Sequence, residues 1–199
     1  MRENCVRRAI FHAVLWNGPG GFARLTEFFS LTKPVIAAVN GLAVGGGFEL
    51  ALAADLIVAS TATRFLLPET QLGILPDSGG LLRLPKSVPV RLAREMILTG
   101  RRIEAQEALT FGLASRVVEP DALLDAALEL ARGIVAGAPL AITAARDILR
   151  ATEGIEVEDA YRLMRSGAIP SYRDMLDSED ALEGPRAFAE GRASIWQGR

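Results

Sequence analysis

The chain has 199 residues, half of them hydrophobic and 23% charged, a composition typical of a folded globular protein with a substantial core. Its formal net charge is −2, so no general affinity for nucleic acid or for an anionic membrane surface is indicated. A single cysteine, Cys5, and a single histidine, His12, exclude an intrachain disulfide framework and a His/Cys metal cluster. With no signal-peptide pattern at the N-terminus, we expect a protein of the reducing cytoplasm.

The first half of the chain predicts an α/β core. Residues 33–40 form a short apolar run typical of a fully buried strand, and residues 48–55 favour a short helix. Residues 56–60 predict a second buried strand. The whole run 34–59 is long enough to cross a membrane, but Asn40, Glu49 and Asp55 interrupt it. A strand–loop–helix–strand unit with a parallel crossover explains it better.

The second half of the chain is predicted to be mainly helical. Residues 68–85 are rich in glycine and proline and are expected to form turns. Helices are expected over 90–99 and 103–111, each ended by a glycine, with a brief extended piece at 113–118. Further helical spacing of apolar residues follows over 121–137, 139–152, 157–167 and 178–192.

Three consecutive glycines, Gly45–Gly47, stand just before the short helix predicted over 48–55. Glycines allow a backbone to approach a ligand closely, and the first N–H groups of a helix have no partner within it. Such a loop suits an anion or a developing oxyanion. It matches neither the dinucleotide-binding nor the phosphate-loop pattern, so a nucleotide phosphate site is not indicated. Tight packing of the helix against a strand would explain the same glycines.

Three acidic residues near this loop are candidates for chemistry. Glu49 falls in the first turn of the predicted helix, Glu69 follows it by 20 residues, and Asp77 by 28. Two carboxylates from separate elements that meet at one site can divide the work of acid and base. Glu49 could also be an ordinary helix N-terminal acid, and Glu69 and Asp77 ordinary turn acids. Spacing alone leaves both interpretations open.

Two linked motifs, "KPVIAAVNGLAVGGGFELALAADLIVAS" and "FLLPETQLGILPDSGGLLRLPK", resemble the enoyl-CoA hydratase/isomerase (crotonase) superfamily. The resemblance runs from Gly18 to the C-terminus. It implies a crotonase-like ββα superhelix core, here shortened at its N-terminus, and a helical C-terminal region. The expected division is an unmatched segment 1–17, a core 18–120 and an oligomerisation region 121–199. The sequence segments "TGRRIEAQEAL" and "SEDALEGPRAFAE" most resemble those of the branch of this superfamily that acts on crotonobetainyl-CoA.

The resemblance also implies roles for individual residues. The N–H of Gly46 would donate to the thioester oxygen of a CoA substrate, and Glu49 and Glu69 would hold a water between them. The remaining expected substrate-binding residues are Gly45, Gly47, Phe65, Leu75, Asp77 and Phe188. Phe188 would line a neighbouring subunit's pocket, although packing in its own core is equally compatible with its helical position.

This sequence departs from the usual family pattern in three places. Relatives carry a longer N-terminal segment, which supplies a second oxyanion donor and part of the adenine pocket. Gly191 stands where relatives often have a lysine for the CoA phosphates, and the neighbouring Arg192 is a possible substitute. Asp77 stands where many hydratases have glycine. Dienoyl-CoA isomerases have aspartate at that position, but they pair it with aspartate where Glu49 stands.

The resemblance therefore implies a hydro-lyase that adds water across the C2–C3 double bond of an enoyl-CoA. An enoyl- or dienoyl-CoA isomerase is the alternative within catalysis, and a catalytically impaired subunit is the alternative outside it. No metal or redox cofactor is implied, and the expected assembly is a homotrimer or a dimer of trimers. Cys5, His12 and Trp196 are expected to have no catalytic role.

Overall fold

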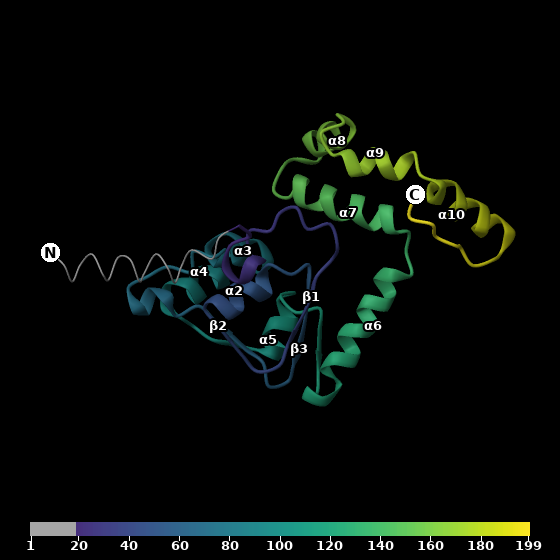
Figure 1. Ribbon diagram of the computed structural model, residues 1–199. Coiled ribbons are helices and arrows are strands. Elements are labelled where there is room, and N and C mark those ends of the chain that lie inside the picture. Colours follow the sequence, from purple (N-terminus) through teal and green to yellow (C-terminus); the bar gives the residue numbers. More distant parts are fainter. Residues whose placement is uncertain (1–18) are drawn as a thin grey trace. The chain divides into compact units, whose positions relative to one another are not determined.

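The computed structural model describes residues 19–199, which divide into two compact units (Figure 1). The first, here called the α/β unit, contains the described residues up to Leu31 together with Val35–Leu128. The second, the helical unit, contains Thr32–Pro34 and Glu129–Arg199. The segment 1–17 distinguished in the sequence, with Cys5 and His12, lies outside the described residues.

Two small sheets form the frame of the α/β unit. The first sheet has the order β1-β3-β6 and is parallel throughout. In the second, of order β2-β4-β5, β2 pairs parallel with β4 and β4 antiparallel with β5. The strands are β1 (Ile36–Val39), β2 (Leu42–Val44), β3 (Leu56–Ser60), β4 (Arg64–Leu66), β5 (Ile103–Glu104) and β6 (Arg116–Val118). The first four strands therefore alternate between the sheets, and a helix follows β2 and again β4, the order of a ββα superhelix. β5 then extends the second sheet and, after α5, β6 extends the first.

The predicted parallel crossover is confirmed, because Ile36 of β1 lies opposite Leu56 of β3. The prediction that residues 33–40 form a fully buried strand is wrong for the part of the chain described here. Within residues 19–199, β1 pairs with β3 alone, so it lies at a sheet edge and Ala38 is exposed. The central strand β3 is buried as expected. The three-residue strands β2 and β4 are too short to leave an alternating pattern in the sequence.

Helices pack against these sheets and enclose one hydrophobic core. They are η1 (Phe22–Arg24), α2 (Gly46–Leu52), η2 (Glu69–Leu72), α3 (Gly80–Ser87), α4 (Val90–Thr99), α5 (Ala105–Thr110), η3 (Pro120–Ala122) and α6 (Leu123–Val135). The fully buried side chains of this core include Phe48, Phe65, Leu67, Leu84 and Met96. The predicted stops at Gly100 and Gly112 are confirmed, and both glycines have positive φ. The turn-rich prediction for 68–85 is wrong from Gly80 onward, where α3 begins.

The helical unit consists of the end of α6 and four further helices. These are α7 (Pro139–Thr152), α8 (Val157–Arg165), α9 (Pro170–Leu176) and α10 (Glu179–Glu190). The sequence did not indicate α9. Ser178 caps α10 by accepting a hydrogen bond from the Ala181 N–H, as expected of a serine at an N-cap.

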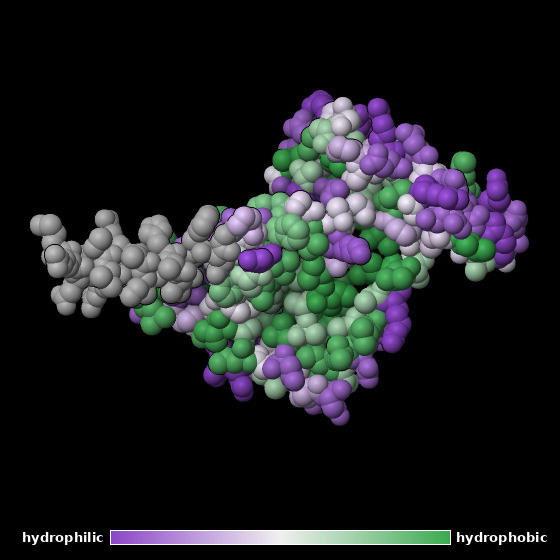
Figure 2. Space-filling view, viewed as in Figure 1, coloured by the Kyte–Doolittle hydropathy of each residue, from purple (hydrophilic) through white to green (hydrophobic). Residues whose placement is uncertain are grey.

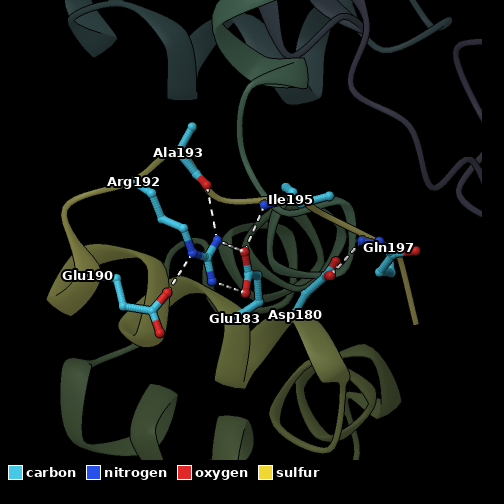
Figure 3. Close-up of polar contacts among 7 residues, drawn as sticks. All are labelled: Asp180, Glu183, Glu190, Arg192, Ala193, Ile195 and Gln197. Carbon is cyan, nitrogen blue, oxygen red and sulfur yellow. Dashed lines mark hydrogen bonds and ion pairs between the residues drawn. The ribbon is translucent and has the colours of Figure 1, made fainter.

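Acidic side chains of α10 hold the C-terminal residues against that helix, an arrangement here called the C-terminal clasp (Figure 3). The Asp180 carboxylate accepts hydrogen bonds from the N–H groups of Gln197 at 2.7 Å and Gly198 at 2.9 Å. Glu183 accepts from the Ile195 N–H at 2.9 Å and pairs with the Arg192 guanidinium. The hydrogen bond from Arg192 lowers the pKa of Glu183 to about 2. The clasp thus satisfies backbone groups that would otherwise be open at the chain end.

Several large apolar side chains of the α/β unit are exposed, among them Phe29, Leu42 and Leu72. Hydrophobic residues also gather on the face drawn in Figure 2. Contiguous exposed apolar surface is typical of a face that a partner or ligand covers. Among residues 19–199, no single helix is long and apolar enough to span a membrane, and only the bent pair 120–135 and 139–152 passes that test by length and composition.

Candidate active site

The glycine loop joins β2 to α2, and each of its first two glycines lies against a side chain. Gly45 has φ +53° and ψ −125°, a conformation that glycine tolerates and L side chains avoid. A Cβ at Gly45 would lie 2.5 Å from the Glu69 Oε1, and one at Gly46 would lie 2.8 Å from the Phe22 ring. No atom lies within 4 Å of the Cβ position of Gly47. A side chain at either of the first two positions would therefore have to displace the Glu69 carboxylate or the Phe22 ring.

Glu49 lies on α2, one turn into the helix, and is 3% exposed. Its Oε1 accepts a hydrogen bond of 2.8 Å from the N–H of Gly80, the first residue of α3. Burial raises the pKa of Glu49, the bond from Gly80 opposes this rise, and the nearby charges of Glu69 and Asp77 add to it. The net direction is upward, so this carboxyl group holds its proton more tightly than an exposed glutamate does.

Glu69 begins the short helix η2 and is 7% exposed. Its Oε2 is buried and has no hydrogen-bond partner among the residues that the structure describes, while its Oε1 lies against the backbone of Gly45. Burial raises the pKa of Glu69, the hydrogen bond from its own backbone N–H opposes this rise, and the charge of Asp77 adds to it. A buried carboxylate oxygen without a partner is costly, and such costs are typically tolerated where a ligand or water is bound.

The two glutamates and the glycine loop therefore meet in one buried place, although they come from separate elements. The sequence predicted this meeting only as one of two interpretations. The geometry supports the acid–base interpretation, because two carboxyl groups with raised pKa values flank a loop whose first helical N–H groups have no partner within α2. Among residues 19–199 there is no group of three or more His, Cys, Asp or Glu side chains that could hold a metal ion.

The raised pKa of Glu69 predicts a stability effect that depends on pH. Because the folded-state pKa is above the unfolded value of 4.5, the ionised carboxylate destabilises the fold, and this cost grows as pH rises through the folded pKa. We expect Glu69→Gln to unfold at a higher temperature than the parent at pH 8, by about 2–4 °C for each kcal/mol that the charge costs. Thermal unfolding followed by circular dichroism should show the gap closing towards pH 5. An equal gap at both pH values would contradict the assignment.

The other residues predicted to bind substrate are more scattered. Asp77 lies in the loop between η2 and α3 and is exposed, and Leu75 of the same loop is 56% exposed. Phe65 is fully buried, its ring centroid 4.9 Å from that of Phe48, so it offers no open surface to a ligand in this structure. Its predicted role at the pocket, like that of Leu75 and Gly47, stays a prediction.

Three residues near the C-terminus receive a clearer account from the structure. Phe188 lies on α10 and is 89% exposed, so it does not pack in the core of its own chain. The Arg192 guanidinium contacts Glu183, Glu190 and the carbonyl of Ala193, so it serves the C-terminal clasp rather than standing open for a phosphate. Trp196 donates from Nε1 to the Ala136 carbonyl, a packing role as expected.

Two residues that contact the glycine loop or Glu49 were not predicted from the sequence. Gly80 supplies the backbone donor to Glu49, and any side chain there would crowd Pro76, Leu67 and the Glu49 carboxylate at 2.9–3.1 Å. The paired glycines before an apolar helical run were a usable signal for such a donor. Phe22 packs on Gly46 from η1, a contact between distant segments that no local pattern marks.

Comparison with known proteins identifies a single family. Residues 3–199 match the family described as enoyl-CoA hydratase/isomerase. The chain is 60% identical over 182 residues to a carnitinyl-CoA dehydratase of Citrobacter koseri, an alignment that covers 92% of this chain and 70% of the relative. A carnitinyl-CoA dehydratase of Salmonella typhi is 59% identical with the same coverage.

Solved structures with the same fold include two enoyl-CoA hydratases. That from Mycobacterium marinum has a TM-score of 0.85 and 39% identity, covering 93% of this chain and 71% of the other. That from Bacillus anthracis has a TM-score of 0.83 and 35% identity, covering all of this chain and 72% of the other. The predicted crotonase-like fold with a helical C-terminal region is thereby confirmed.

Proposed function

The chain belongs to the enoyl-CoA hydratase/isomerase family, and from this and the buried acid pair we propose that it reversibly adds water across the C2–C3 double bond of an enoyl-CoA thioester. We propose crotonobetainyl-CoA as its substrate and carnitinyl-CoA as the product, after the names of its curated relatives. The observation that carries the proposal is the convergence of Glu49 and Glu69 beside Gly45 and Gly46.

The acid pair would perform the proton transfers. A water held between Glu49 and Glu69 loses a proton to one carboxylate as its oxygen bonds to C3, and the other carboxyl group gives a proton to C2. The sum is one water added, and both glutamates regain their starting states after proton exchange. Raised pKa values favour this division, because one group can remain protonated nearer to neutral pH while the other ionises. The unpartnered Glu69 Oε2 is a natural acceptor for the water.

The backbone would stabilise the charge that forms on the substrate. As water attacks C3, negative charge develops on the thioester oxygen, and the N–H of Gly46, the first residue of α2, would donate to it. Loss of one such donor typically costs about 3–4 kcal/mol of transition-state stabilisation. The substrate itself brings the CoA thioester that makes C3 electrophilic, so the proposed chemistry needs no further cofactor.

The proposal is tested by incubating the purified protein with crotonobetainyl-CoA in ¹⁸O-labelled water. Mass spectrometry should find the label in a new C3 hydroxyl group. Isomerisation is the second candidate, because Asp77 stands where dienoyl-CoA isomerases have an aspartate. In that case a dienoyl-CoA incubated in heavy water would show a shifted double bond and no added oxygen.

We also propose that the protein works in the cytoplasm as a homotrimer or a dimer of trimers. The exposed apolar side chains of the α/β unit and the open position of Phe188 support an assembly of this kind, because both offer surface for another subunit to cover. In such an assembly Phe188 would contact the neighbouring subunit's substrate pocket.

A further inference from the structure

The loop of residues 74–80 is tied to both buried glutamates. At its start the Ile74 N–H donates to the Glu69 carbonyl at 3.0 Å, and at its end the Gly80 N–H donates to the Glu49 carboxylate at 2.8 Å. Asp77 stands at the middle of this loop. Because the loop is hydrogen-bonded to Glu69 at its start and to Glu49 at its end, the side chain of Asp77 is held near the acid pair.

The Asp77 carboxylate differs from the two glutamates in its surroundings. It is exposed, and within residues 19–199 it has no ion-pair partner. Its own N–H donates to the Leu75 carbonyl at 2.9 Å, and the preceding Pro76 is fully buried against Gly80, so the backbone of the turn is fixed. Arg83, which approaches Gly79 on the same loop, directs its guanidinium to the Thr26 carbonyl.

The loop that joins the two buried glutamates thus carries an exposed third carboxyl group, that of Asp77. The charge of Asp77 is felt by both glutamates, since it raises the pKa of each. The Oε2 of Glu69 is buried without a hydrogen-bond partner among the described residues, so the acid pair has an acceptor left for a polar group. A site with this charge disfavours anionic acyl groups and favours cationic ones.

We propose that Asp77 selects acyl groups that carry a positive charge, by placing its carboxylate beside a quaternary ammonium at the end of a short acyl chain. This inference rests on the proposed function. In crotonobetainyl-CoA the ammonium nitrogen is only two bonds from C3, so it must lie close to the glutamates that flank C3 and to the loop that joins them. A quaternary ammonium has no N–H to donate and is recognised by charge and by apolar contact. Asp77 offers the charge and the exposed Leu75 the contact.

The test compares a cationic substrate with an uncharged analogue of the same shape. Crotonobetainyl-CoA and 5,5-dimethylhex-2-enoyl-CoA differ only in replacing the trimethylammonium group by a tert-butyl group. We expect the parent protein to prefer the cationic substrate in kcat/KM, and Asp77→Asn to lower that preference by about 10- to 100-fold. Because the same protein sample is assayed with both substrates, misfolding or a changed acid pair cancels in the ratio. Asp125→Asn, which removes an exposed acid from α6, should leave the ratio unchanged.

Binding measurements separate this inference from the proposed function. Calorimetric dissociation constants for carnitinyl-CoA and its tert-butyl analogue need no turnover. If neither enoyl-CoA is hydrated but Asp77→Asn still loses its preference for the cationic ligand, the proposed reaction fails and the inference stands. If hydration is normal and the ratio is the same in the parent and in Asp77→Asn, the inference is overturned and the reaction stands. Absence of binding to either ligand overturns both.

Discussion

Glu49→Gln and Glu69→Gln should each lower kcat for hydration of crotonobetainyl-CoA by about 10³-fold, within the 10²–10⁴-fold that a positioned general acid or base contributes. Each amide keeps the shape of the carboxyl group but can neither accept nor release the proton. In Glu49→Gln the side-chain oxygen can still accept the 2.8 Å bond from the Gly80 N–H, so the site should stay assembled. Rates are measured with saturating substrate, by loss of the enoyl thioester absorbance.

Three results together make this expectation specific. Thermal unfolding should show that neither amide variant is less stable than the parent, because each removes a buried charge. Glu156→Gln, an exposed acid before α8, should retain full activity. The double variant should lose little more than either single one if the two carboxyl groups act on one water as a unit. Full activity of either single variant would reject the assignment of the acid pair.

The parts of the fold that were predictable are those with a local physical signal. The β-branched run before the glycine loop predicted β1, and the loop itself predicted the start of a helix at residue 48, two residues after α2 begins at Gly46. Glu49 stood out because desolvation makes a lone carboxylate in an apolar run expensive, which implies a reason for its presence. Helices α4 and α5 ended where glycines with positive φ allow the chain to turn away.

The parts that were not predictable depend on contacts between distant segments. β2 and β4 have three residues each, and what defines them is the pairing of Leu42 with Arg64, not any pattern in either strand. The edge position of β1 within residues 19–199 likewise follows from which strands are its neighbours. At the site, the donor to Glu49 is the backbone N–H of Gly80, 31 residues away along the chain. A pattern of side chains in the sequence does not indicate such a backbone donor.

Contacts that the sequence does not reveal also explain why Arg192 has a role different from the predicted one. Arg192 was a candidate for the CoA phosphates because of its place beside Gly191 and its charge. The structure instead gives it a carboxylate partner nine residues back, since the chain reverses after Gly191, which ends α10 in a left-handed conformation. A charged residue next to a helix-ending glycine can therefore contact the last turns of its own helix. Whether it is open to a ligand depends on the direction that the chain takes after the glycine.

Gly45→Ala should lower kcat by about 100-fold or more and destabilise the protein by about 1–3 kcal/mol. Two separate causes act at this residue. Its φ of +53° with ψ of −125° is strained for any L side chain. Its new Cβ would lie 2.5 Å from the Glu69 Oε1, so the carboxylate must move. A displacement of about 1 Å in a reacting group is enough to cost two orders of magnitude in rate.

A second glycine separates the two causes. Gly112 also has a positive φ, of +77°, but nothing lies within 4 Å of its Cβ position. Gly112→Ala therefore carries backbone strain without disturbing Glu69, and it should lower the unfolding temperature while kcat stays within about twofold of the parent. If both alanine variants lost activity in proportion to their lost stability, strain alone would explain Gly45. A selective loss in Gly45→Ala would show that this glycine is required because the Glu69 carboxylate must approach the backbone at that point.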